Sequence, residues 1–189
     1  NDDLPMWLLV DWPTVREIFG EDISGRKFTY LGDGNNMSHA WLIMGDIMGA
    51  HIVVATPEGK WAPDADVVAQ ARKLAVVSGA TIEVLNDPEL AAKNASVIYT
   101  DVWMSMGDSE SDRAEKTKAL RPFAVDAHLM DLTAHDAIFM HCLPAHRGEE
   151  VSAEVIDGPR SVIWREALHR RTTIQALLYH LVKGEVKGN

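Results

Sequence analysis

An apolar segment runs into a thiol, two imidazoles and a guanidinium in the stretch Phe139-Met140-His141-Cys142-Leu143-Pro144-Ala145-His146-Arg147. Residues Ala137 to Met140 are typical of a short strand buried on both faces, and Pro144 then stops the pairing and turns the chain. In a parallel α/β sheet, ligands bind outside the carboxyl ends of the strands. We therefore expect chemistry here, although a lone cysteine is more often a small buried hydrophobic residue.

Working outward from this stretch, strands alternate with helices along the chain. The other predicted strands are Lys27 to Leu31, His51 to Ala55, Thr81 to Leu85 and Val97 to Thr100, with Ser161 to Trp164 as a candidate sixth. The predicted helices are about Ser38 to Gly49, Asp64 to Ser78, a segment opened by Asp87-Pro88, a charged, solvated helix or loop from Ser111 to Leu120, and Arg165 to Lys183. Asp64 is the expected N-cap of the second helix, and Gly79 and Gly184 are the expected stops of the second and last. In the last helix, one apolar face is expected to carry Ile174, Leu177, Leu178 and Leu181. This alternation predicts an α/β fold, a three-layer Rossmann-like doubly wound parallel sheet of five to six strands.

Length and composition limit the classes of protein that the chain can represent. With 189 residues, of which 47% are hydrophobic, it can bury one large core, assigned to residues 21–189. A net charge of −10 argues against nucleic acid or an anionic membrane as a partner. The single cysteine excludes an intramolecular disulfide. Neither a secretory signal nor an apolar run of about 18 residues is found, which predicts a soluble, cytoplasmic protein.

Residues 1–20 are expected to form a terminal segment that packs on the domain or on a partner. The segment is apolar, and Pro13 would break a helix if it lay in the interior of one. Its tryptophans fit a core and an interface equally well. We predict a protein contact through Leu4, Trp7 and Trp12, most simply in a homodimer.

The turn after the first predicted strand resembles a dinucleotide-binding turn but lacks two of its features. Gly32 and Gly34 are present, Met37 occupies the place of the third glycine, and no acidic residue follows the second strand. We therefore predict no nicotinamide cofactor and no other cofactor. Asn35 and Asn36 would either hold a carboxylate or phosphate at the helix N-terminus or simply cap the helix.

Polar clusters follow three predicted strands: residues 32–36, 101–106 and 141–147. The carboxyl ends of parallel strands meet at one edge of a sheet, so these clusters should converge on one crevice. Asp101 could attract an ammonium group, and the amides near Asn36 could hold a carboxylate. The pattern favours an amino acid as the ligand.

Three motifs, in this order and at these separations, resemble the second domain of the ornithine carbamoyltransferases. They are Gly32-Asp33-Gly34-Asn35-Asn36, Asp101-x-Trp103-x-Ser105-Met106-Gly107 and His141-Cys142-Leu143-Pro144. The resemblance covers nearly all of the chain from about residue 20, and the combination is highly specific. It implies a domain that takes part in transferring a carbamoyl group from carbamoyl phosphate to ornithine, which gives citrulline and phosphate.

The resemblance also implies roles for single residues. Ornithine would be held by Asn36, Asp101, Ser105, Met106 and the backbone of Leu143. Cys142 and Leu143 would lie beside the carbamoyl group, and Arg170 would help to bind carbamoyl phosphate. An alkyl amine with a pKa near 10.4 must lose a proton before it attacks, and Asp101 with a Cys142 thiolate could position the amine and relay that proton.

Other parts of the family pattern are missing. No Ser-x-Arg-Thr-Arg loop occurs, and the His-Pro-x-Gln motif falls on Leu4-Pro5-Met6-Trp7. We therefore expect no turnover by this chain alone. The apolar exchanges favour an engineered single domain, a non-catalytic scaffold or self-associating module, over a natural homologue or fragment. No metal site is predicted, because histidines such as His39, His51, His169 and His180 lack a tight ligand spacing.

Overall fold

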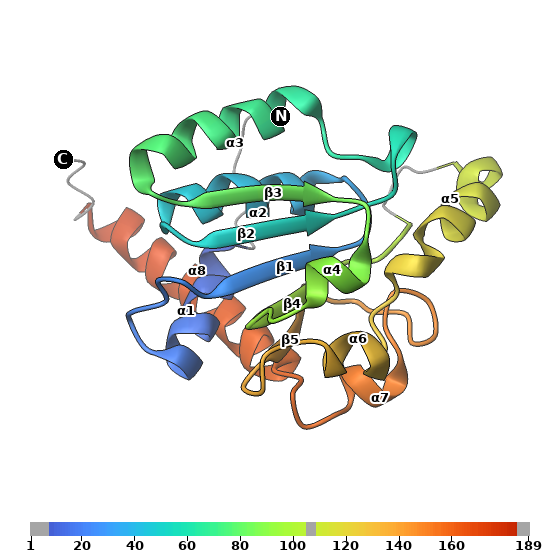
Figure 1. Cartoon of the computed structure of the whole chain (residues 1–189). Coiled ribbons are helices and arrows are strands. Elements are labelled where there is room, and N and C mark those ends of the chain that lie inside the picture. Colours follow the sequence, from blue (N-terminus) through green and yellow to red (C-terminus); the bar gives the residue numbers. More distant parts are fainter. Residues whose placement is uncertain (1–7, 105–108, 185–189) are drawn as a thin grey trace.

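A five-stranded, fully parallel sheet forms the centre of the computed structural model, which describes residues 8–104 and 109–184 (Figure 1). The strands are β1 (Lys27–Leu31), β2 (His51–Ala55), β3 (Thr81–Leu85), β4 (Val97–Thr100) and β5 (Ile138–His141). Their order across the sheet is β3-β2-β1-β4-β5. The predicted fold class is confirmed, and four of the predicted strands have the observed bounds.

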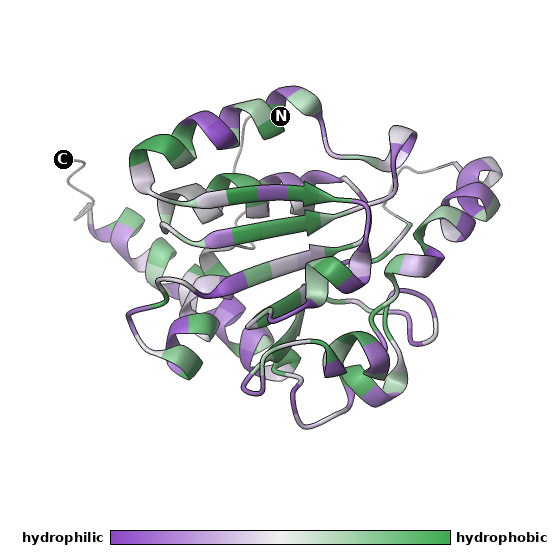
Figure 2. Cartoon of the chain, viewed as in Figure 1, coloured by the Kyte–Doolittle hydropathy of each residue, from purple (hydrophilic) through white to green (hydrophobic). Residues whose placement is uncertain are grey.

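Helices cover both faces of this sheet. They are α1 (Leu8–Phe19), α2 (Asn36–Ile47), α3 (Ala65–Ser78), α4 (Pro88–Ala92), α5 (Arg113–Leu120), α6 (Ala127–Asp131), α7 (Ala153–Ile156) and α8 (Ile163–Lys183). One apolar core joins residues of α1, α2 and α3 to one face of the sheet, and a second joins α4, α6 and α7 to the other. In Figure 2 the sheet is mostly hydrophobic, whereas α5 is mostly hydrophilic.

Local sequence signals explain where several helices begin and end. Asp64 accepts hydrogen bonds from backbone N–H groups of the first turn of α3, and Asp87 does the same for α4. Gly79 and Gly184 end α3 and α8 in the left-handed conformation, which glycine adopts without a steric penalty. The predicted caps of these helices are thus confirmed.

Two predictions about the ends of the domain are wrong. Ser161 makes only an isolated parallel bridge with Phe139, and the chain enters α8 at Ile163, so no sixth strand forms. Pro13 lies inside α1 rather than breaking it. Proline lacks the N–H that would bond to the carbonyl four residues earlier, but α1 is held in place by packing against α8 and the core.

The predicted contact face of the N-terminal segment is wrong for Trp12, while packing of this segment on the domain is one of the two expected outcomes. Trp12 is 6% exposed and packs in the core beside Phe28, so it does not belong to an exposed contact face. Leu4 and Trp7 lie outside the described residues. In the ranges 8–104 and 109–184, none of the helices is both long and apolar enough to cross a membrane.

Candidate active site

The strand order makes the carboxyl end of the central strand β1 the expected place for a ligand. The chain winds from β1 outward to β3 on one side, and β4 and β5 continue the sheet on the other side. The order therefore reverses between β1 and β4, and open α/β sheets bind ligands at such a switch point. Asn35 and Asn36 follow β1 there, and Asp101 directly follows β4.

Asp101 connects the segments that follow three neighbouring strands. Its Oδ2 accepts a hydrogen bond from Nδ2 of Asn35 over 3.2 Å, and its Oδ1 accepts one from the Cys142 thiol over 2.9 Å. The backbone N–H of Val102 donates to the same Oδ1 over 2.7 Å. The predicted convergence of the three clusters is therefore present for Asn35, Asp101 and Cys142.

The two asparagines differ in their surroundings. Oδ1 of Asn35 accepts from the backbone N–H groups of Met37 and Ser38 at the start of α2, so the capping interpretation is right for Asn35. Its amide still reaches Asp101. Asn36 is exposed in the first turn of α2, where backbone donors and the helix dipole favour an anion. The carboxylate of an amino acid is such an anion.

Cys142 is a thiol and not a thiolate in this arrangement. Burial raises its pKa well above the ordinary value, and the charge of Asp101 raises it further. The sulfur therefore acts as a hydrogen-bond donor to Asp101. The role of Cys142 as a proton acceptor stays a prediction, and the raised pKa weighs against the thiolate form.

Leu143 and Arg170 complete the corner after β5. Leu143 has a φ of 53°, in the left-handed region, which is strained for a residue with a side chain. Its N–H donates to Nδ1 of His141 over 2.8 Å. Arg170 reaches back from α8 and donates to the carbonyl of Cys142. Arg170 thus lies at the predicted site, whereas Ser105 and Met106 lie outside the described residues.

A buried ion pair near the site could not be read from the sequence. Nζ of Lys116 in α5 lies 2.6 Å from Oδ2 of Asp33, and the two side chains are 2% and 10% exposed. The charged segment around Lys116 was expected to be solvated. The sequence offered only Asp33 as a hint of this pair. Asp33 follows the first glycine of the β1 turn, and a carboxylate that becomes buried needs a partner.

A second buried group, below the site, joins α1 to α8. Asp11 and Glu166 share a side-chain hydrogen bond, and the backbone N–H of His141 donates to Oε2 of Glu166 over 3.0 Å. Burial raises the pKa of Asp11 to about 7 and that of Glu166 well above its ordinary value, while the Arg170 cation opposes both shifts. This pair supports the helix that carries Arg170.

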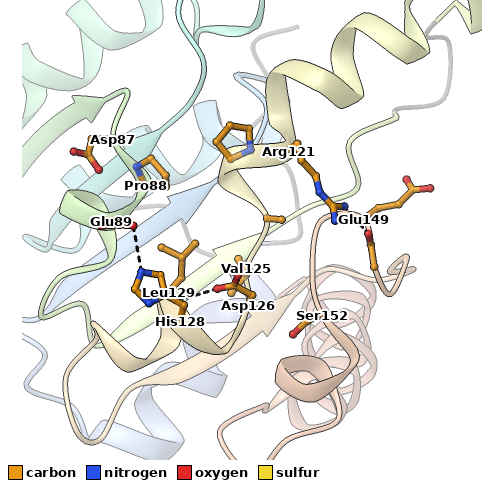
Figure 3. A pocket seen from close by; sticks show the side chains of 13 residues that line it. Asp87, Pro88, Glu89, Arg121, Val125, Asp126, His128, Leu129, Glu149 and Ser152 are labelled. Carbon is orange, nitrogen blue, oxygen red and sulfur yellow. Dashed lines mark hydrogen bonds and ion pairs between the residues drawn. The ribbon is translucent and has the colours of Figure 1, made fainter.

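A surface hollow of about 570 Å³ lies elsewhere, over α4 and α6 (Figure 3). Figure 3 shows Glu89 bonded to His128 on one side of it and Arg121 near Glu149 on the other. Asn35, Asp101 and Cys142 do not line it. The hollow is therefore separate from the predicted amino-acid site.

The fold and the convergent residues define an α/β domain with polar side chains gathered at its switch point. Residues 24–181 match the family model described as aspartate/ornithine carbamoyltransferase, Asp/Orn binding domain. The chain therefore belongs to this family and corresponds to its Asp/Orn binding domain. The resemblance noted from the motifs is thus confirmed.

Relatives and solved structures give the same family. The chain is 49% identical over 182 residues to an ornithine carbamoyltransferase of Pyrococcus abyssi, covering 95% of this chain and 56% of that protein. It matches the structure of ornithine carbamoyltransferase from Pyrococcus furiosus with a TM-score of 0.88 and 48% identity, covering 97% of this chain and 57% of the other. For ornithine transcarbamoylase from Giardia lamblia the TM-score is 0.85 at 32% identity, with 93% and 59% covered. The chain spans somewhat over half the length of these relatives.

Proposed function

We propose that this domain binds ornithine in the crevice beside β1 and β4 and presents its δ-amine for carbamoylation. The contact that carries the proposal is the one between Asp101 and Cys142. This hydrogen bond holds the carboxylate of Asp101, which follows β4, against Cys142, which follows β5 and lies 41 positions later in the sequence. A carboxylate at that place can hold the ammonium group of ornithine and position the amine once it loses its proton.

The other end of the amino acid fits the N-terminus of α2. Asn36 is exposed in the first turn of that helix, and the helix dipole there favours the α-carboxylate. A dibasic amino acid thereby meets donors for its carboxylate and an acceptor for its side-chain ammonium. Ser105 and Met106 belong to the same site in this proposal, on the strength of the shared motif.

Carbamoyl phosphate is proposed to be held mainly by a further domain. Arg170 is a cation at the proposed site, but carbamoyl transfer requires several donors around the charge that develops on the departing phosphate. Exposed apolar side chains on α8 support contact with such a domain: Trp164, Leu168, Leu177, Leu178, Leu181 and Val182. Exposed apolar side chains in this number on one helix favour a contact with another part of a protein.

Titration calorimetry with L-ornithine tests the proposal. The native chain should bind ornithine, and Asn36→Ala should weaken binding because it alters the carboxylate end. Glu89→Gln serves as the control, since Glu89 lines the separate hollow of Figure 3. Absence of ornithine binding by the native chain would contradict the proposal. Binding that is lost only in the Glu89 variant would place ornithine in the other hollow.

A further inference from the structure

The loop between β5 and α7 gathers three metal-ligating side chains outside the ornithine crevice. His146, Glu149 and Glu150 each offer one ligand atom, and these atoms lie within 4.8 Å of one another. The three residues have different surroundings: His146 is exposed, Glu149 is half-buried and Glu150 is fully buried. A buried acid at the bottom of an otherwise open cluster requires a physical explanation.

Glu150 is held in place through one oxygen only. Its Oε1 accepts the backbone N–H of His146 and lies 3.4 Å from Nε2 of His141. Nδ1 of His141 accepts from the N–H of Leu143, so a neutral ring carries its hydrogen on Nε2 and turns it towards Glu150. His141 thus lies close behind Glu150, although its Nε2 makes no hydrogen bond to the described residues.

The second oxygen of Glu150 has no such support. Oε2 is buried and has no hydrogen-bond partner among the described residues. It lies 3.8 Å from Nδ1 of His146, which reaches the surface with 55% of its side chain exposed. A buried carboxylate oxygen without a donor is unfavourable, and a cation between it and the imidazole would remove that penalty.

We propose that His146, Glu149 and Glu150 bind a divalent cation, with Zn²⁺ as the representative ion. One imidazole nitrogen and two carboxylates are suitable ligands for zinc, and the exposed side of the cluster leaves room for water as a further ligand. Glu149 lies 3.7 Å from Arg113, an exposed ion pair that the metal would have to displace. The backbone N–H of His146 donates to Oε1 of Glu150, and a hydrogen bond of this kind commonly orients a metal-binding carboxylate.

Such an ion would hold together the turn from His146 to Glu150, within the loop between β5 and α7. The loop contains the corner at Cys142 and Leu143, so bound metal would stabilise the crevice without contacting it. This site differs from the expectation that the chain has no metal site. The prediction considered only the spacing between histidines. It therefore missed His146, whose neighbours in the cluster are two glutamates.

Titration calorimetry with zinc chloride on the tag-free chain tests the proposal. The native chain should bind one zinc ion, and His146→Ala and Glu149→Gln should each weaken binding at least about tenfold, since each removes a ligand. Both residues reach solvent, so these variants should keep the fold, as circular dichroism would verify. His128→Ala is the matched control, because His128 and Glu89 form an exposed histidine–glutamate pair 3.2 Å apart.

Two further measurements separate this site from other zinc-binding groups. Cys142→Ser should bind zinc like the native chain, and Co²⁺ bound in place of zinc should give no thiolate charge-transfer absorption. Zinc should also raise the Tm of the native chain by roughly 5 °C at about 100 times its Kd, and raise that of His146→Ala much less. Absence of binding by the native chain, undiminished binding by both loop variants, or loss of binding in Cys142→Ser would each overturn the proposal.

Discussion

The thiol of Cys142 donates its hydrogen bond to Oδ1 of Asp101, and no other hydrogen bond of the thiol is found among the described residues. Asn35 holds Oδ2 of the same carboxylate from the other side. Asp101 is therefore fixed in orientation before any ligand arrives. Preorganisation of this kind lowers the entropy lost when a ligand is positioned.

Asp101→Asn should weaken binding of ornithine much more than binding of norvaline. Norvaline has the same α-carboxylate and α-amine but no δ-ammonium group, so it makes no charged contact with residue 101. A hydrogen bond to a charged group contributes about 1.5–3 kcal/mol, which corresponds to roughly a tenfold to hundredfold loss for ornithine. Calorimetry on both ligands measures this, and equal losses would remove Asp101 from the role of binding the amine.

The isolated chain should produce no citrulline from ornithine and carbamoyl phosphate above background. Donors that stabilise the departing phosphate usually make the largest contribution to catalysis, and Arg170 alone supplies few of them. A colorimetric citrulline assay with and without a separately expressed carbamoyl-phosphate domain checks this. Citrulline formation by the isolated chain that disappears in Cys142→Ala would contradict the expectation.

Lys116→Met should destabilise the fold by about 3–5 kcal/mol, because it leaves Asp33 buried without its cation. Denaturant unfolding measures the difference. Lys118→Met in the same helix is the control, since Lys118 is exposed and should change the free energy of unfolding by less than about 0.5 kcal/mol. Similar effects of the two variants would mean that the buried pair adds nothing beyond helix packing.

The free energy of unfolding should fall as the pH rises from about 4 to 7 because of Asp11. The pKa of Asp11 is raised from 3.8 to about 7 by burial, so in this range the folded state binds more protons than the unfolded state. The decrease contributed by this residue approaches about 1.4 kcal/mol per pH unit. Asp11→Asn should make the decrease less steep and leave the part that Glu166 contributes through its own raised pKa, whereas exposed Asp66→Asn should leave the profile unchanged. Superimposable profiles for native and Asp11→Asn would refute the assignment.

Replacing Leu178 and Leu181 together by lysine should reduce binding of a hydrophobic dye and any self-association of the isolated chain. Both side chains are more than half exposed on α8. The control replaces Val76 and Val77, which are more exposed but lie on α3. Fluorescence and light scattering over a concentration series distinguish the two faces. Equal reductions would show that the α8 face has no special tendency to associate.

The fold could be predicted from the sequence because its strongest signals are local. Short apolar runs gave the strands, and Asp64, Gly79 and Gly184 marked helix ends. The prediction of a sixth strand was wrong because Ser161 makes only one bridge, to Phe139 of the edge strand, before α8 begins. Periodicity also placed Leu177 and Leu178 on a common helical face, but it could not tell which faces find a partner within the described chain.

The site could be predicted only where motif and topology agree. Asp101 and Cys142 follow neighbouring strands, and parallel pairing brings their positions together. Lys116 and Glu166 were missed because their burial depends on packing between segments far apart in the sequence. The raised pKa of Cys142 has a similar origin, since desolvation of a sulfur cannot be read from its neighbours in the chain.

The packing of α1 against α8 has a consequence for the order in which the molecule can form. Glu17 of α1 lies 2.7 Å from His169 and 3.6 Å from Arg165, so the first described helix is completed by the last. During synthesis, α1 leaves the ribosome before any strand of the sheet. It can pack against α8 only after all five strands have been made. A nascent chain stopped before residue 163 would keep Asp11 in contact with water, and its carboxyl group would be charged until the final helix arrives.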